Sequence, residues 1–286
     1  MLARHIKIFR RRGNLTLQFR LNRMLKANQE FMFVTGCSRS GTSVMSNLLR
    51  VHPAIGLGRE RFADHYFYEA DFPQALFEKE RFCKIIRPSD SHHRELEAYY
   101  GELYCRFESC RYIGDKIPPI ALDYSKLLRN FARPRIVFML RNIFDVADSF
   151  NLRVRKARAS GRTDGWPWGR DSSEAIAEWN RSLKQTLKVT EEIQLHTVVY
   201  ERLFEDDSEI KSLFGFLDLP FTDTVVAAHH DLMAEHRELD QARRLSLSGL
   251  EKFEIMKRAS FGAYRQMLDL AGRQGVAGAG SKNLTI

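Results

Sequence analysis

FMFVT-GCSRSGTS, residues 31–43, is the stretch that decides the fold. Residues 31–35 form a short apolar run, a glycine-serine loop follows from Gly36 to Ser43, and helix-like spacing continues to Arg50. Strand, loop and helix in this order bring backbone N–H groups together at the start of the helix, where they can bind an anion. Glycines also occur in plain turns, but this context favours the anion site.

The loop has the spacing of a nucleotide-binding Walker loop, Gly-x4-Gly-x-Ser/Thr, with one important difference. Thr42 stands where a Walker loop has the lysine that reaches the β and γ phosphates of ATP or GTP, and Arg39 lies inside the loop instead. These two substitutions argue against an enzyme that uses ATP or GTP, such as a P-loop kinase or nucleotide hydrolase.

A second anion site is indicated at the end of the apolar run RIVFML, residues 135–140. A P-loop NTPase usually has an aspartate for Mg²⁺ at such a strand end, whereas this chain has Arg141. An arginine at the carboxyl end of a parallel strand lies where open α/β sheets bind ligands, and it can hold a phosphate. Ser149, two helical turns further on, can add a hydroxyl. The alternative for Arg141 is an ion pair with Asp145. We expect no metal.

Short apolar runs alternate with helical spacing along the rest of the chain, while residues 52–58, with Pro53 and two glycines, indicate a turn. The apolar runs are 112–113, 135–140 and 196–200, and the helical segments are 91–109, 120–131, 142 onward, 172–193, 208–217, 222–237 and 249–271. This alternation predicts an α/β fold, a P-loop-like three-layer arrangement with a mostly parallel central sheet flanked by helices. We expect one domain at 30–272 and a flexible tail at 273–286.

The composition suits a soluble globular protein. The 286 residues have 44% hydrophobic side chains and a formal net charge of +9, which excludes collagen-like, wholly disordered and polytopic membrane proteins. Four cysteines without a CxxC pair favour a reducing, cytoplasmic compartment. Residues 1–29 form an arm with eight basic residues and no acid. This arm is either solvated or in contact with an anionic membrane surface; a lipid- or nucleic-acid-binding module is the non-enzymatic alternative.

Two motifs resemble those of sulfotransferases that use 3′-phosphoadenosine 5′-phosphosulfate (PAPS). Residues 35–43 look like the 5′-phosphosulfate loop of this family, and residues 141–149 look like its 3′-phosphate motif. The order of the motifs and their separation of about a hundred residues also fit. The resemblance extends over roughly residues 31–205 and implies PAPS as sulfuryl donor, PAP as product, and a hydroxylated acceptor. A homodimer is also expected, and nucleic acid is not an expected partner.

The resemblance also implies a role for individual residues. It assigns binding of the 3′-phosphate to Arg141 and Ser149, and places Tyr200, in a Tyr-Glu-x-Leu segment, near the nucleotide. It assigns binding of the 5′-phosphosulfate to the loop residues Arg39, Ser40, Gly41, Thr42 and Ser43. Glu60 falls where tyrosylprotein sulfotransferases have their catalytic base, and Lys116 falls where they have a lysine beside the sulfate. A carboxylate base is needed because a hydroxyl is a poor nucleophile until its proton is removed. Lys116 and Arg39 stabilise the charge that develops on the bridging oxygen.

The residues around Glu60 depart from the tyrosylprotein pattern. That pattern has an acidic residue before the base and an arginine two residues after it, whereas this chain has Arg59 and Phe62. We therefore expect a carbohydrate or glycolipid acceptor, with a protein tyrosine or another phenol as the alternative. Glu60 could instead be an ion-pair partner of the arginines that flank it, Arg59 and Arg61.

Overall fold

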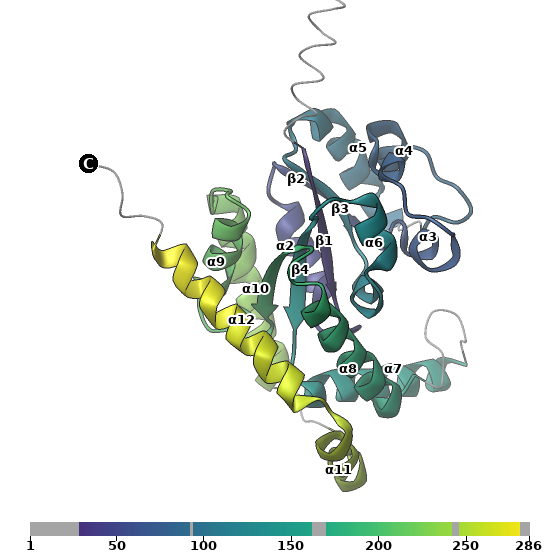
Figure 1. Ribbon diagram of the computed structural model, residues 1–286, viewed down its shortest axis with the longest axis vertical. Coiled ribbons are helices and arrows are strands. Elements are labelled where there is room, and N and C mark those ends of the chain that lie inside the picture. Colours follow the sequence, from purple (N-terminus) through teal and green to yellow (C-terminus); the bar gives the residue numbers. More distant parts are fainter. Residues whose placement is uncertain (1–28, 92–93, 162–169, 242–245, 281–286) are drawn as a thin grey trace, which may run out of the picture.

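The computed structural model describes residues 29–91, 94–161, 170–241 and 246–280. Its centre is a five-stranded sheet in the order β2-β3-β1-β4-β5, and every neighbouring pair of strands is parallel (Figure 1). The strands are β1 (Glu30–Gly36), β2 (Ile55–Arg59), β3 (Tyr112–Lys116), β4 (Arg135–Leu140) and β5 (Gln194–Val199). The order confirms the predicted parallel sheet, with the strand before the glycine-serine loop at its centre.

Alternating residues of β1 face the two sides of the sheet, and each side has its own core. Met32 and Val34 belong to one core together with Met45 of the helix that follows. Phe33 belongs to the other core, where it packs edge-on against Phe131 at 5.1 Å between ring centroids. Both faces of the central strand are thus buried, as expected of a parallel sheet covered by helices.

Helices on both faces complete the three layers (Figure 1). The face with Met45 is covered by α2 (Thr42–Arg50), α9 (Ser208–Phe216) and α10 (Asp223–Gln241). The opposite core is lined by residues of α3 (Ala63–Tyr68), α4 (Lys79–Cys83), α5 (Glu97–Arg106), α6 (Ser125–Asn130), α7 (Ile143–Ser160), α8 (Ser172–Lys188), α11 (Gly249–Arg258) and α12 (Phe261–Gly280). Short 3₁₀ helices lie at Gln74–Phe77, Arg94–Leu96, Phe107–Ser109, Pro118–Leu122 and Glu201–Phe204. The predicted helices on both faces are confirmed.

Strand β2 corrects the turn that was expected at residues 52–58. Its glycines are required by close packing, because a Cβ on Gly56 would lie 2.7 Å from Ile113 Cδ1, and one on Gly58 would lie 2.6 Å from Asp115 Oδ1. Glycine within a strand often marks such a close approach. The two glycines made the local sequence look like a turn, whereas they are required by contacts with the neighbouring strand β3.

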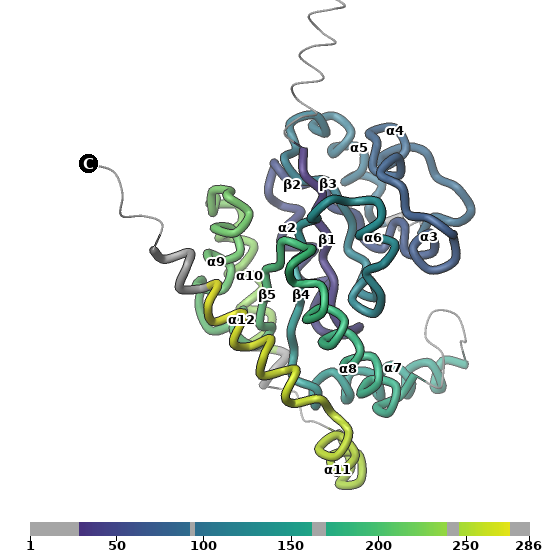
Figure 2. The backbone as a smooth tube through the Cα atoms, viewed as in Figure 1, coloured from purple at the N-terminus to yellow at the C-terminus, as the bar shows by residue number. Residues whose placement is uncertain are grey.

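The C-terminal helical region differs from the single helix expected at 249–271. It breaks between α11 and α12, where the side chain of Asn180 donates to Arg258 O at 2.8 Å and accepts from Ser260 N at 2.7 Å. Figure 2 shows the chain turning at this break. Helix α12 then continues to Gly280, and Gln274 bonds to both Thr197 N and Leu195 O of the edge strand β5. Helix α12 thus continues beyond residue 272.

Three further expectations concern the two ends of the chain, membrane-spanning segments and the cysteines. Residues 1–28 of the basic arm and 281–286 of the tail lie outside the described residues. In the part of the chain that is described, no helix is both long and apolar enough to cross a membrane. The four cysteines are free thiols, and Cys105 is the exposed one among them.

Candidate functional site

The carboxyl ends of all five strands bring the predicted site residues to one edge of the sheet. The loop with Arg39 follows β1, Glu60 follows β2, Lys116 ends β3, Arg141 follows β4, and Tyr200 follows β5. Strands on both sides of β1 therefore contribute residues to one site at this edge of the sheet, where open α/β sheets bind ligands.

The glycine-serine loop has the backbone of an anion cradle. Arg39 and Gly41 have left-handed φ values of 69° and 91°, and Thr42 begins α2 directly afterwards. The N–H groups of Thr42 and Ser43 lie in the first turn of the helix, where such groups have no helical acceptor. Ser40 is buried, and its hydroxyl has no hydrogen-bond partner among the described residues. The loop thus offers several donors within a few residues.

Tyr200 closes one side of this loop. Its ring lies so close to Gly41 that an added Cβ would approach the ring carbons to 2.3 Å and 2.5 Å. The Arg141 guanidinium lies over the same ring, 3.9 Å from its centroid. This cation–π contact orients Arg141 toward the loop, to which it also donates through Nη1–Arg39 O at 3.1 Å.

The structure joins the two predicted anion motifs directly. Arg39 Nε donates to Ser149 Oγ on α7 at 3.0 Å, so the loop after β1 touches the helix after β4. Burial, followed by the charges of Arg153 and Arg141, lowers the pKa of Arg39 to about 10. Arg39 still carries its charge at neutral pH. Mutual repulsion among the three guanidinium groups favours a bound anion between them. Arg153 was not among the predicted site residues; its position one helical turn after Ser149 on α7 was the available signal.

Glu60 and Lys116 form an ion pair at the ends of β2 and β3. Lys116 Nζ donates to Glu60 Oε1, and Glu60 N donates to Lys116 O at 2.9 Å. The Lys116 side chain is 1% exposed while that of Glu60 is 42% exposed, so the carboxylate remains reachable from solvent. Burial lowers the pKa of Lys116, and the charge of Glu60 opposes this change. The alternative pairing of Glu60 with its flanking arginines is not observed: Arg59 pairs with Glu95 at 3.2 Å.

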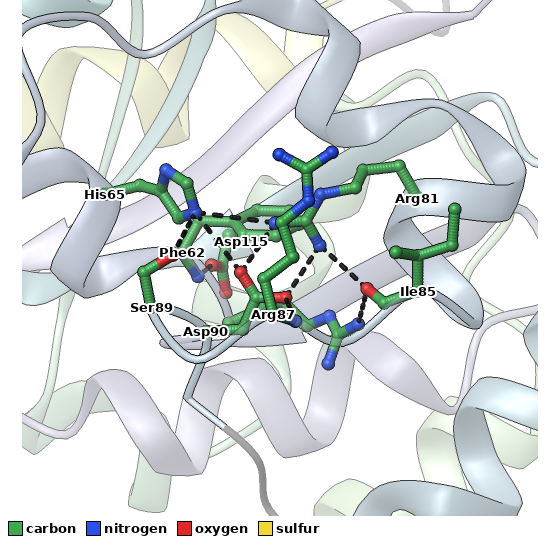
Figure 3. A network of polar contacts seen from close by, with 9 residues as sticks. Phe62, His65, Arg81, Ile85, Arg87, Ser89, Asp90 and Asp115 are labelled. Carbon is green, nitrogen blue, oxygen red and sulfur yellow. Dashed lines mark hydrogen bonds and ion pairs between the residues drawn. The ribbon is translucent and has the colours of Figure 1, made fainter.

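A buried polar network connects α3, α4 and the loop after α4 (Figure 3). Arg81 holds Asp90 with two hydrogen bonds of 2.6 Å and 2.7 Å. His65 Nε2 lies 3.2 Å from Asp90 and 3.0 Å from Ser89 Oγ. The network ties α4 and the loop after it to α3, the helix that begins three residues after Glu60.

A buried carboxylate beside the anion loop was not predicted from the sequence. Glu178 on α8 is 5% exposed, and its Oε1 accepts the N–H of Ser38 at 2.6 Å. Its other oxygen accepts from Arg170, which also lies 3.5 Å from Ser38 Oγ. The next residue, Trp179, donates to Arg141 O at 2.9 Å. Helix α8 therefore supports both anion motifs. Glu178 was not predicted as a site residue, because an acidic side chain is not expected beside an anion-binding site.

Cations and backbone donors dominate this site. Among the residues that the structure describes, no group of three or more His, Cys, Asp or Glu side chains could hold a metal ion. Chemically, the arrangement can bind a compound with more than one phosphate-like group and present a carboxylate and an ammonium beside it.

The chain is similar to several known proteins. A protein of Caenorhabditis briggsae, named as an inferred protein-tyrosine sulfotransferase, is 25% identical over 232 residues, 76% of this chain and 75% of that protein. A sulfotransferase domain from the curacin biosynthetic pathway matches with a TM-score of 0.48 and 20% identity, over 70% of this chain and 77% of that one. Sulfotransferase STF9 from Mycobacterium avium matches with a TM-score of 0.45 and 13% identity, over 85% and 76%.

The model of the sulfotransferase family matches residues 32–223, which is most of the chain. The match begins in β1 and ends at the first residue of α10, so it includes the ends of all five strands, where the candidate site residues lie. The chain belongs to the sulfotransferase family.

Proposed function

We propose that this sulfotransferase transfers a sulfuryl group from PAPS to the hydroxyl of an acceptor, with Glu60 as base. The observation that carries the proposal is the junction of the two anion motifs: Arg39 contacts Ser149 at 3.0 Å and Arg141 at 3.1 Å. A nucleotide with anionic groups at both its 3′ and 5′ positions fits such a double site, whereas ATP or GTP has no 3′-phosphate to fill the second half.

The residues present fit this donor. The buried Ser40 hydroxyl lacks a partner among the described residues, and a ligand oxygen can satisfy it. Two groups would hold the donor: Arg39, Ser40, Gly41, Thr42 and Ser43 at the 5′-phosphosulfate, and Arg141 with Ser149 at the 3′-phosphate. Tyr200 fixes the position of Arg141 and lines the loop at Gly41. PAPS, when bound, supplies the activated sulfuryl group.

The chain's own groups then control proton and charge. The exposed carboxylate of Glu60 accepts the proton of the acceptor hydroxyl, a contribution of typically ~10²–10⁴-fold. Lys116, whose ammonium is already directed at this carboxylate, stabilises negative charge that develops between donor and acceptor. Arg39 neutralises charge on the phosphate side. Buried cations are effective here because the water that would screen them is excluded.

For the acceptor, we propose the hydroxyl of a carbohydrate or glycolipid. The support is the departure from the tyrosylprotein pattern at Arg59 and Phe62, since Phe62 is fully buried and its N–H is used internally. A protein tyrosine is the second candidate, because the named function of the Caenorhabditis briggsae relative favours it. Labelled PAPS, offered with sugars, glycolipids, simple phenols and tyrosine peptides in parallel, distinguishes the two by which acceptor becomes labelled.

The nucleotide assignment is tested by calorimetry of PAP binding to Arg141→Ala. Losing a charge-assisted phosphate contact costs about 1.5–3 kcal/mol, so we expect PAP affinity to fall about 10- to 150-fold. Arg135→Ala is the matched control, because Arg135 begins the same strand at the opposite end and stacks near Phe216 at 5.2 Å. Equal PAP affinity in Arg141→Ala and wild type would remove the assignment.

A further inference from the structure

Asp115 directly precedes Lys116 of the Glu60–Lys116 pair and is fully buried. It is the penultimate residue of β3 and stands opposite Gly58 in the register with β2. A Cβ on Gly58 would lie 2.6 Å from Asp115 Oδ1 and 2.9 Å from Cγ. The absence of a side chain at Gly58 is therefore what makes room for this carboxylate at the end of β2.

Both oxygens of Asp115 hold backbone on either side of the pair. Oδ1 accepts the N–H of Lys116 at 2.8 Å, and Oδ2 accepts the N–H of Phe62 at 2.9 Å. Between Gly58 and Phe62 the chain turns at Glu60, which has a left-handed φ of 56°. A non-glycine residue keeps such a conformation only when its surroundings impose it. The bond from Phe62 to Asp115 is part of that constraint.

Charged groups close to Asp115 come from several elements. Lys116 adjoins it in β3, Glu60 and Arg61 lie in the turn after β2, and Tyr100 of α5 and Arg50 of α2 interact with it electrostatically. Burial raises the pKa of Asp115 to about 7, while the backbone hydrogen bonds of the turn oppose this change. A buried carboxylate is costly, and a role confined to filling the core would be met by an apolar residue.

We propose that Asp115 is a positioning residue, which holds the backbone of Glu60 and Lys116 so that their side chains meet in the geometry needed for transfer. This inference rests on the proposed function of Glu60 as base. It assigns no contact with donor or acceptor to Asp115: its effect passes through the turn at Glu60 and the peptide of Lys116.

The test is Asp115→Asn, which keeps the shape of the side chain but presents an amide NH₂ to one of the two backbone N–H groups. Misplacing a catalytic group by about 1 Å can cost about 100-fold, so we expect kcat to fall about 10- to 100-fold. PAP affinity should stay within about twofold of wild type, because the phosphate residues lie on other strands. Asp207→Asn is the control: Asp207 also accepts a hydrogen bond from a buried group, His229, far along the chain from the pair.

A double-mutant cycle with Glu60→Gln separates positioning from general loss of structure. If Asp115 acts by aligning the Glu60–Lys116 ion pair, which Glu60→Gln already removes, the double variant should be no more than about twofold slower than Glu60→Gln alone. Additive losses, or full turnover in Asp115→Asn beside a defective Glu60→Gln, would overturn the positioning role and leave the proposed function intact. Full turnover in Glu60→Gln would instead overturn the proposed base, and the inference with it.

A second variant covers the case in which Asp115→Asn does not fold. Gly58→Ala leaves the carboxylate in place and displaces it, since the new methyl group cannot lie 2.6 Å from Oδ1. We expect the same separation of kcat from PAP affinity. A Gly58→Ala enzyme that is folded, as shown by thermal unfolding, and fully active would contradict the inference.

Discussion

Glu178 places a buried carboxylate beside the loop that we propose binds the 5′-phosphosulfate. The carboxylate accepts the Ser38 N–H at 2.6 Å and pairs with Arg170. The bond stabilises the loop, because it satisfies a donor that would otherwise be left without an acceptor. The charge, in contrast, opposes binding of a phosphate nearby. One side chain therefore has two effects of opposite sign on nucleotide affinity, and two variants can separate them.

Glu178→Gln should bind PAP several-fold more tightly than wild type, whereas Glu178→Ala should bind it more weakly. Glutamine keeps an oxygen for the Ser38 N–H and removes the charge; alanine removes both, and the lost buried bond should lower the free energy of unfolding by about 1–3 kcal/mol. Calorimetry at two salt concentrations and thermal unfolding measure the two effects. If glutamine weakens PAP binding as much as alanine does, the carboxylate charge itself supports the loop, and this account of Glu178 is incorrect.

At the scale of elements, the sequence predicted what depends on local pattern. The central strand, its loop and the strand that ends at Arg141 were predicted because continuous apolar runs and phosphate-binding residues are local signals. Strand β2 was not, because Gly56 and Gly58 are set by Ile113 and Asp115 on the neighbouring strand. The α11–α12 break was also missed, because its cap is Asn180, a residue about 80 positions away.

Strand β5 carries the clearest dependence of stability on pH. His196 is buried in this strand and its ring stacks on Phe216 at 5.1 Å. Burial lowers its pKa from 6.5 to about 4. The folded protein therefore holds His196 neutral while the unfolded chain protonates it, so its contribution to stability is present above pH 6.5 and is lost as pH falls toward 4. The loss amounts to about 3 kcal/mol.

Asp115 acts in the opposite direction over nearly the same range. Its pKa is raised from 3.8 to about 7, so its contribution is present below pH 3.8 and is lost as pH rises toward 7. These two contributions therefore oppose each other between pH 4.5 and 7. In His196→Leu the contribution of His196 is removed, and the free energy of unfolding should fall more steeply with rising pH than it does in wild type. Chemical denaturation at both pH values measures this, and parallel profiles for the two proteins would contradict the assignment to His196.

At the scale of the whole molecule, β1 is the central strand and has two strands on each side. β3 and β2 lie on one side of it and bring Lys116 and Glu60, while β4 and β5 lie on the other and bring Arg141 and Tyr200. Under the proposed function, donor binding and acceptor activation belong to different halves of the sheet, and they meet at the loop with Arg39. The family resemblance predicted the members of each half. The contact of Arg39 with Ser149 could not be predicted, because it depends on how two loops approach across the sheet.

Nearly all of the net positive charge lies in the first 29 residues of the chain. Residues 1–29 have eight basic and no acidic side chains, and the rest of the chain has 37 basic and 36 acidic ones. The rest of the chain is therefore nearly neutral, and the cations of the candidate site, Arg39, Lys116 and Arg141, are concentrated at the carboxyl ends of the strands. Glu30, the first residue of β1, pairs with Arg135 at 2.7 Å and with Arg111 at 3.6 Å, so the sheet is tied at its amino end by residues outside the arm.

Removing residues 1–28 should accordingly leave the thermal unfolding temperature, PAP affinity and turnover unchanged. We propose that the arm binds an anionic membrane surface, so the same deletion should abolish sedimentation with vesicles of phosphatidylcholine and phosphatidylserine. Wild-type binding should weaken with salt, since each basic residue near such a surface contributes about 1 kcal/mol that ions screen. A full-length variant with the eight basic residues changed to glutamine is the matched control for charge at constant length. Vesicle binding that survives both changes would place the membrane contact in the catalytic part, and loss of PAP affinity on deletion would make the arm part of the nucleotide site.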